Sequence, residues 1–215
     1  MPPALLALDL STSHGSIAVL KDDAVVFEAA FQSERSHNAQ VFAPLRDALA
    51  AAGDGLRGIV IGTGPGSYTG VRIAIAAAQG IALSRGVWCV GWSSLTAPHI
   101  DAPASYRVIG DARRQSFYLA QVENGRLLPQ LETVDADTAR ARVAESGPWL
   151  SFDAKTPLDL ENVRLARPSA AQLARIVQRC TAEEIASLAA QPLTPHYLAE
   201  AFITTARKPG KAPAL

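Results

Sequence analysis

The stretch from Ile59 to Leu83 constrains the fold most, because it predicts a buried strand, a glycine-rich turn and a long apolar helix in succession. Gly62, Gly64 and Gly66 follow an Ile-Val-Ile run and permit a sharp turn or a close backbone approach. A glycine-rich loop that opens a helix is a common phosphate site. No Lys-Ser or Lys-Thr pair follows, however, and Ser67 stands where a dinucleotide fingerprint requires glycine. The spacing leaves a phosphate site and a packing turn both open.

The predicted helix within this stretch is apolar nearly all round. Such a helix must be buried on more than one side. We therefore expect it to lie deep inside the domain or to form part of a subunit interface. Arg72, Gln79 and Gly80 interrupt it, which argues against a membrane span. Its small residues, which would let another backbone approach closely, are Gly70, Ala74, Ala77, Ala78 and Ala82.

Composition limits the partners that the chain can hold by itself. Its 215 residues, 48% of them hydrophobic, suffice for one large domain or two small ones. The chain has 20 basic residues (Lys plus Arg) and 20 acidic ones (Asp plus Glu). A protein that binds nucleic acid without a partner normally has an excess of basic residues, so a nucleic-acid role would require a partner. Cys89 and Cys180 form no CxxC motif, which favours a reduced, cytoplasmic location. The first residues resemble neither an export signal nor a membrane anchor.

The N-terminal residues predict an antiparallel meander of three strands, at residues 5–10, 16–20 and 24–31, joined by polar turns. Asp9 is the only charge in the first strand, and several hydroxyls follow it in the turn 11–15. One carboxylate beside hydroxyls and amides suits a phosphate with its Mg²⁺. Asp9 could equally serve only to cap the turn, and the residues leave both interpretations open. The candidate cofactor-binding residues are Asp9, Ser11 and Thr12.

The second half of the chain begins by repeating this layout. Strands are predicted at 106–109 and 116–122, and Asn124-Gly125 is a strong hairpin pattern that leads into a third strand. A repeat of layout without a repeat of sequence indicates two related α/β lobes. We expect an N-terminal lobe at 1–102, a smaller C-terminal lobe at 103–203 and a disordered basic tail at 204–215.

Several motifs together resemble the TsaB family, the small bacterial subunits of the system that makes N6-threonylcarbamoyladenosine in tRNA. The resemblance is good over roughly residues 4 to 120 and loose beyond. It implies the actin-like, Hsp70-like ATPase (ASKHA) fold, with two lobes that are each a β-meander with following helices. The motifs are Leu8-Asp9-Leu10-Ser11-Thr12, Arg35-Ser36-His37, Gly64-Pro65-Gly66-Ser67-Tyr68-Thr69-Gly70-Val71-Arg72-Ile73, Ser93-Ser94-Leu95 and Asp111-Ala112-Arg113-Arg114.

The resemblance implies a function in a complex. Members of this family bind and activate TsaD, the larger paralogue that carries the active site, and TsaE, an ATPase, joins them. The product is the modified adenosine at position 37 of tRNAs that read codons starting with A. ATP or ADP and Mg²⁺ are possible in the complex, while this chain is expected to hold no cofactor of its own.

The family contact with TsaD implies an interface on two helices, expected here at about 38–52 and 69–84. Without its partner, we expect the chain to form a homodimer whose two-fold axis lies beside Val71, Ala74, Ile75 and Ala78. The full set of predicted interface residues is Val41, Leu45, Tyr68, Val71, Arg72, Ala74, Ile75 and Ala78.

The comparison with TsaD predicts a non-catalytic chain. TsaD-like proteins carry two metal-binding histidines in an Asn-His-Leu-Glu-Gly-His stretch, and Ser94 and Pro98 stand at those positions here. Proline cannot bind a metal through its side chain, so we expect no metal site and no catalytic residue. Two alternatives from other classes are a stand-alone ATPase or kinase of the actin-like fold and a glycoprotease-like peptidase. A further departure is Ala199, which replaces the arginine of the family's C-terminal Pro-x-Tyr-x-Arg element.

Overall fold

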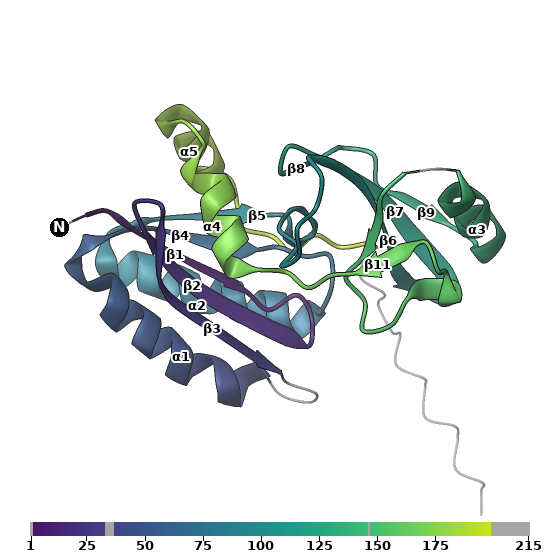
Figure 1. The fold of residues 1–215 in the computed structure, drawn as a ribbon. Coiled ribbons are helices and arrows are strands. Elements are labelled where there is room, and N and C mark those ends of the chain that lie inside the picture. Colours follow the sequence, from purple (N-terminus) through teal and green to yellow (C-terminus); the bar gives the residue numbers. More distant parts are fainter. Residues whose placement is uncertain (1, 33–36, 146, 199–215) are drawn as a thin grey trace, which may run out of the picture.

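The computed structural model describes residues 2–32, 37–145 and 147–198, which form two β-sheets arranged as two lobes (Figure 1). The first sheet has five strands in the order β3-β2-β1-β4-β5. β1, β2 and β3 are the predicted antiparallel meander, and β4 and β5 continue parallel to β1. The strands span Ala4–Asp9 (β1), His14–Lys21 (β2), Ala24–Gln32 (β3), Leu56–Gly62 (β4) and Trp88–Trp92 (β5).

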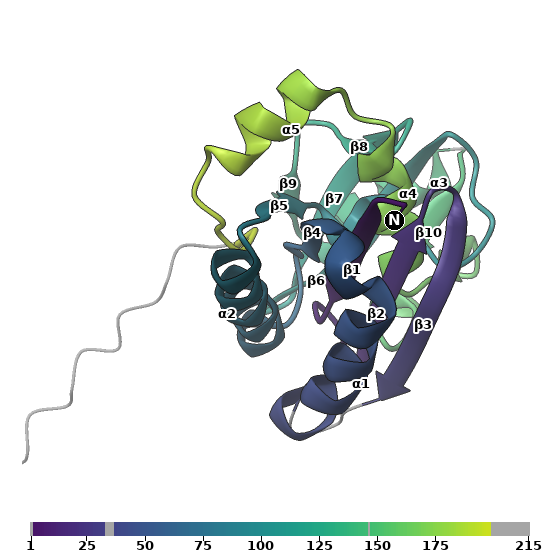
Figure 2. The ribbon, with the colours of Figure 1, turned by 90° about the vertical axis from the view of Figure 1, so that its left-hand side faces the viewer.

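Helices cover both faces of this sheet. α1 (His37–Ala52) and α2 (Tyr68–Arg85) pack on one face, and α4 (Ala170–Gln178) packs on the other (Figure 2). β1 is buried on both sides and therefore reads as a near-continuous apolar run, whereas the edge strand β3 alternates between exposed and half-buried residues. α2 is capped at both ends, because Ser67 Oγ accepts from Gly70 N at its start and Gly86 is left-handed at its end.

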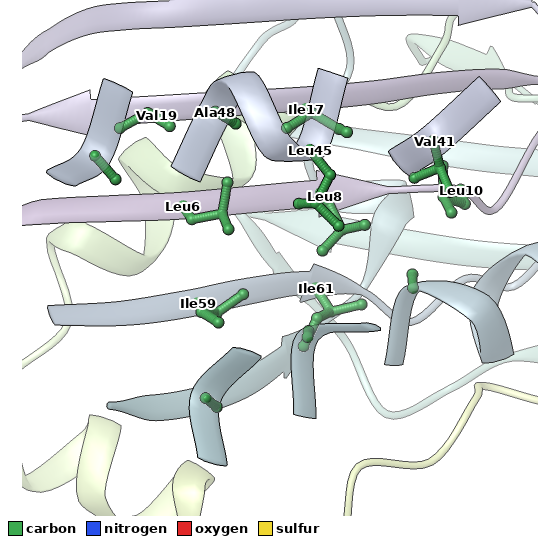
Figure 3. Packing of buried hydrophobic residues seen from close by; sticks show 14 of the residues in the cluster. Leu6, Leu8, Leu10, Ile17, Val19, Val41, Leu45, Ala48, Ile59 and Ile61 are labelled. Carbon is green, nitrogen blue, oxygen red and sulfur yellow. The ribbon is translucent and has the colours of Figure 1, made fainter. Parts of the chain in front are cut away.

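The main core lies between the sheet and the pair α1 and α2. Leu6, Leu8 and Ile61 from the strands meet Val41 and Leu45 of α1 there (Figure 3). The small residues of α2 let the helix approach the sheet closely, so Ala74 and Ala78 are also fully buried. The apolar helix of the sequence is thus an inner element of one lobe.

The second sheet repeats the topology of the first, but its strands β8, β10 and β11 are shorter than their counterparts. Its order is β11-β10-β6-β7-β8, with β9 also pairing with β7, and β10 and β11 run parallel to β6. The expected repeat of layout is confirmed and extends to the parallel strands. The elements are β6 (Ser105–Arg113), β7 (Ser116–Glu123), β8 (Arg126–Leu127), β9 (Glu132–Val134), α3 (Ala136–Ala144), β10 (Trp149–Ser151) and β11 (Val163–Leu165), with short 3₁₀ helices at Gly53–Gly55, Ser94–Thr96 and Pro157–Asp159.

The chain crosses between the lobes twice, and the two crossings lie side by side. His99 N donates to Arg167 O at 2.9 Å, Arg167 N donates to His99 Nδ1 at 2.9 Å, and Pro98 forms a β-bridge with Pro168. After the second crossing the chain returns to the first sheet as α4 and α5 (Ala182–Ala189). These two helices, which a division at residue 103 counts with the second lobe, therefore pack on the first. The predicted tail at 204–215 and Ala199 lie outside the described residues.

Candidate functional site

A cleft of about 1430 Å³ separates the lobes, and the turns that end β1 and β6 face each other across it. The first lobe contributes the turn 11–14, the glycine loop and the start of α2. The second lobe contributes the turn 111–115 and the segments 152–158 and 165–167. The end of the described chain, residues 195–198, closes one side. Two of the three candidate cofactor residues, Ser11 and Thr12, line this cleft.

Asp9 is held inside the first lobe. Its side chain has no contact with solvent, and its Oδ1 accepts from Ser11 N at 2.8 Å and from Ser11 Oγ at 2.7 Å. Its Oδ2 is buried without a hydrogen-bond partner among the described residues. Burial raises the pKa of Asp9, and the hydrogen bonds from Ser11 offset part of that rise. Asp9 and Ser11 are thus buried and hydrogen-bonded to each other, and of the three candidates only the Thr12 side chain is exposed to solvent in the cleft.

The glycines of the loop allow it to pack directly against this turn. A Cβ at Gly62 would lie 1.7 Å from Asp9 Oδ2, and a Cβ at Gly66 would lie 2.0 Å from Ser11 O. Gly70, in the first turn of α2, is as close to Leu10 O, at 2.0 Å. The glycines therefore serve close packing of the loop and α2 against the first turn, which is one of the two interpretations that the spacing left open. Pro65, Gly66 and Ser67 of the same loop also line the cleft.

The turn between β6 and β7 is the counterpart of this turn in the second lobe, and it is open to the cleft. Asp111 Oδ1 accepts from Arg113 N at 2.6 Å, the same bond that Asp9 makes two residues ahead. Arg113, Arg114 and Gln115 all have positive φ, at 73°, 54° and 62°, which is costly for residues other than glycine. Asp153 Oδ2 accepts from Asp111 N at 2.8 Å and holds the turn in place. Asp111, Arg113 and Arg114 were part of the family resemblance but were not predicted as a site.

A cluster of aromatic rings and a cation stands at the mouth of the cleft. The Arg72 guanidinium lies 3.8 Å from the centre of the Tyr68 ring and donates to Tyr197 Oη at 3.0 and 3.2 Å. The two tyrosine rings are 5.5 Å apart, and both are about half exposed. The contact of Tyr68 and Arg72 with Tyr197 was not predicted, because Tyr197 lies near the other end of the chain.

No metal site is present among the described residues, which contain no group of three His, Cys, Asp or Glu side chains that could hold an ion. The two positions compared with the TsaD histidines have structural roles instead. Ser94 Oγ accepts from Gly64 N at 2.9 Å, and Pro98 pairs with Pro168 between the lobes. These residues connect the loop and the crossings, and neither side chain offers a metal ligand of the histidine type.

The predicted interface residues lie on the predicted helices, but most of them face inward. Val41, Leu45, Val71, Ala74, Ile75 and Ala78 are no more than 7% exposed, because they pack against the first sheet. These six side chains are therefore not exposed to a partner, while an interface and a two-fold axis on these helices stay predictions. Tyr68 and Arg72 do lie on the outer side of α2. Sequence analysis missed two other exposed apolar side chains on these helices, Phe42 and Leu83.

These features define a class of protein: a two-lobed, actin-like α/β fold with a cleft between the lobes. Residues 31–188 match the family model of tRNA N6-adenosine threonylcarbamoyltransferase, TsaD. The chain belongs to this family, and its named relatives are of the TsaB type, also called YeaZ. No helix among the described residues is long and apolar enough to cross a membrane.

Relatives and solved structures agree on this family. The chain is 37% identical over 134 residues to the tRNA threonylcarbamoyladenosine biosynthesis protein TsaB of Bacillus subtilis, which covers 57% of each chain. It is 38% identical over 95 residues to TsaB of Escherichia coli, covering 42% of this chain and 40% of that protein. The matched region therefore spans only about half of these relatives. The structure of YeaZ from Pseudomonas aeruginosa has a TM-score of 0.67 and 24% identity, over 90% of this chain and all of that one, and it supports the fold.

Proposed function

We propose that this chain is a non-catalytic subunit required for N6-threonylcarbamoyladenosine formation at position 37 of tRNA, and that it binds and activates a TsaD-type transferase. The names of its relatives, which are biosynthesis proteins of this modification, support the pathway. The role of a subunit is supported by the large apolar side chains that are exposed on the outer face of α1 and α2. A TsaE-type ATPase and the tRNA would then act on the complex rather than on this chain alone.

The outer face of α1 and α2 is defined by Phe42, Tyr68, Arg72 and Leu83. Phe42 is 59% exposed and Leu83 is 88% exposed, although both are large and apolar. The described chain exposes six large hydrophobic side chains, and three of them, Phe42, Tyr68 and Leu83, lie on these helices. A fourth, Tyr197, lies with its ring beside that of Tyr68. Aromatic residues and arginine are enriched at the centres of protein interfaces. The same surface would form the homodimer when the partner is absent.

A separate catalytic role is less well supported by the site. A stand-alone ATPase or kinase would need the first-lobe turn to accept a phosphate with Mg²⁺, but Asp9 and Ser11 are enclosed. A metallopeptidase would need ligands where Ser94 and Pro98 stand. We accordingly place the transferase chemistry in the partner, together with any ATP, ADP or Mg²⁺ that the complex holds.

Co-purification of the full chain with its TsaD-type partner tests this proposal. Leu83→Glu and Phe42→Arg place charges on the outer face without touching the core, so we expect each to abolish a stoichiometric complex while circular dichroism shows a native fold. Val26→Arg on the exposed edge strand β3 is the matched control, because Val26 is 47% exposed and lies outside α1 and α2.

Two results would count against the proposal. A complex that survives both outer-face substitutions would move the interface elsewhere on the chain. Absence of any complex with the unmodified chain, together with ATP turnover by the isolated protein, would favour a separate enzyme. Ala74→Arg is unsuitable for this test, because Ala74 is fully buried and the variant would lose its fold.

A further inference from the structure

We propose that the cleft between the lobes binds a segment of single-stranded RNA, with its phosphates on the second-lobe turn and a base on the tyrosine pair at the mouth. The cleft cations are Arg113, Arg114, Lys155 and Arg167, and the stacking platform is Tyr68 and Tyr197. This inference rests on the proposed function in tRNA modification. It adds a contact surface for the RNA on the subunit that carries no active site.

The charge of the cleft is the first argument. Among the described residues that line it, four arginine and lysine side chains face only two carboxylates, Asp111 and Asp153, in a chain whose total charge is balanced. Asp153 accepts a backbone amide of the turn, and Asp111 pairs with Arg113, whose Nη1 lies 3.5 Å from Asp111 Oδ2, so the two carboxylates offset only part of the positive charge. The excess of positive charge is therefore concentrated on one wall of the cleft. A basic groove of this kind follows a phosphate backbone.

The strain of the arginine turn is the second argument. Arg113 and Arg114 occupy left-handed backbone positions that glycine or asparagine would adopt at lower cost. Side chains hold the turn there: Asp111 accepts from Arg113 N, and Ser116 Oγ donates to Arg113 O at 2.7 Å. Two arginines at strained positions beside an open cleft fit a binding role better than a structural one.

Electrostatic coupling across the cleft agrees with this. His14 lies on the first-lobe wall, and its pKa is lowered by partial burial and then by the positive charges of Arg167 and His99. Arg167, at the crossing between the lobes, therefore lies close enough to the first-lobe wall to act on a charge there. The platform adds stacking, since the exposed halves of Tyr68 and Tyr197 offer faces on which a base can lie.

The size and chemistry of the cleft favour a strand over a mononucleotide. Its volume of about 1430 Å³ exceeds the roughly 300–1,000 Å³ of ordinary small-molecule pockets. The turn that would grip a terminal phosphate with a metal ion is closed, because Asp9 has no solvent contact. What remains open is a polar, basic groove with aromatic faces at one end, which suits several linked nucleotides.

Fluorescence anisotropy with a labelled oligoadenylate of about ten nucleotides tests the proposal directly. For the full chain at low salt we expect saturable binding in the range of about 10⁻⁴ to 10⁻⁶ M. Arg113→Ala/Arg114→Ala should weaken it at least about tenfold and reduce the slope of log K against log salt by about 1.4, which corresponds to two phosphate contacts on a single strand. Arg57→Ala/Arg164→Ala is the matched control, because it removes the same charge from exposed positions outside the cleft.

The tyrosine platform needs a separate pair of variants. Tyr197→Leu removes the ring and should weaken binding about fivefold or more, whereas Tyr197→Phe removes only the hydroxyl that accepts from Arg72 and should leave binding within about twofold. Ultraviolet cross-linking of the same oligonucleotide should label residues of the cleft walls or the platform.

Three outcomes would overturn the inference: no saturable binding by the chain or by its complex, equal loss in the control pair, or displacement of the oligonucleotide by ATP with Mg²⁺ at the concentrations of a mononucleotide site. Partner binding is read separately. Arg113→Ala/Arg114→Ala should still co-purify with the TsaD-type partner, so a failure of RNA binding with an intact complex removes this inference alone. Loss of the complex by the Phe42 and Leu83 variants with RNA binding intact concerns only the part of the outer face away from Tyr68, which belongs to both surfaces.

Discussion

The two lobes use the same turn in opposite ways. In the first lobe, Asp9 accepts from the amide two residues ahead and is then enclosed by the glycine loop. In the second lobe, Asp111 makes the same bond, but the arginines that follow stay at the surface of the cleft. One turn geometry therefore serves once as part of a core and once as part of an open wall.

The difference shows that a repeated turn can be buried in one lobe and accessible to a ligand in the other. The first turn is closed by neighbouring backbone, since Gly66 and Gly70 let the loop and α2 touch Ser11 and Leu10. No comparable glycine loop follows β10, so nothing seals the second turn. A nucleotide site that needs both turns is not supported, whereas a ligand that uses the second wall is.

Two alanine substitutions in one helix would test how tightly the first turn is closed. Gly70→Ala places a Cβ 2.0 Å from Leu10 O, whereas Gly80→Ala in the same helix meets no atom within 4 Å. We expect Gly70→Ala to destabilise the fold by about 3 kcal/mol through overpacking. Gly80→Ala should stabilise it by about 0.5–1 kcal/mol, because alanine favours the helix. Urea unfolding measures both, and similar effects for the two variants would contradict a closed turn.

Asp9→Asn would test the buried carboxylate. Because burial raises the native pKa of Asp9, the unfolded state loses its proton first, and the stability of the native chain falls as pH rises through the window between the two pKa values. Asparagine keeps the acceptor for Ser11 and does not titrate. We expect the variant to be more stable than the native chain by about 1–2 kcal/mol at neutral pH, with the gap shrinking toward pH of about 4. A gap that is constant with pH would show that burial of the charge is not its cause.

Glycine and alanine at position 114 would separate strain from charge in the second turn. Arg114 has a φ of 54°, so Arg114→Gly should stabilise the chain by about 1 kcal/mol, while Arg114→Ala keeps the strain and should not. Both variants should bind the oligoadenylate more weakly. Thermal unfolding and anisotropy provide the two readouts. A glycine variant that is less stable than the native chain would mean that Arg114 has a structural role.

Arg126 and Glu184 would test the contact between the lobes. Arg126 is the first residue of β8 and forms an ion pair with Glu184 of α5, with Nη2 and Oε1 2.5 Å apart. Its guanidinium lies 5.3 Å from the centre of the Trp92 ring. Both charged side chains are about half exposed, so solvent screens the pair. A double-mutant cycle of Arg126→Ala and Glu184→Gln should give a coupling free energy of about 0.5 kcal/mol that falls with salt. A coupling well above this would mean that the pair fixes the angle between the lobes.

Much of the fold could be predicted from local patterns. The meander at the N-terminus, the strand and helix around the glycine loop and the Asn124-Gly125 hairpin are all confirmed. The capping box of Thr181 and Glu184 at the start of α5 is a local pattern of the same kind. These elements depend on periodicity and on residues a few positions apart, which a sequence displays directly. The return of α4 and α5 to the first sheet was not predicted, because an amphipathic helix does not specify which sheet it covers.

The candidate site was predicted less well than the fold. The interface helices were identified from the family resemblance, but an apolar helix gives no direction, so inward residues such as Ala74 and Ile75 were chosen over Phe42 and Leu83. The basic turn was visible as a charged pair, yet only its position opposite the first turn gives it a ligand-binding geometry.

By itself the sequence determined the α/β class, the two-lobed repeat and the absence of the TsaD histidine pair, since these depend on residue identity and spacing along the chain. Only the tertiary structure decided that the glycines serve packing, that Asp9 is enclosed and that Tyr197 completes a cluster with Tyr68 and Arg72. The physical reason is distance. Such contacts join atoms that are far apart in sequence, such as Arg72 and Tyr197 across 125 positions, and burial and charge environment exist only once those atoms are brought together.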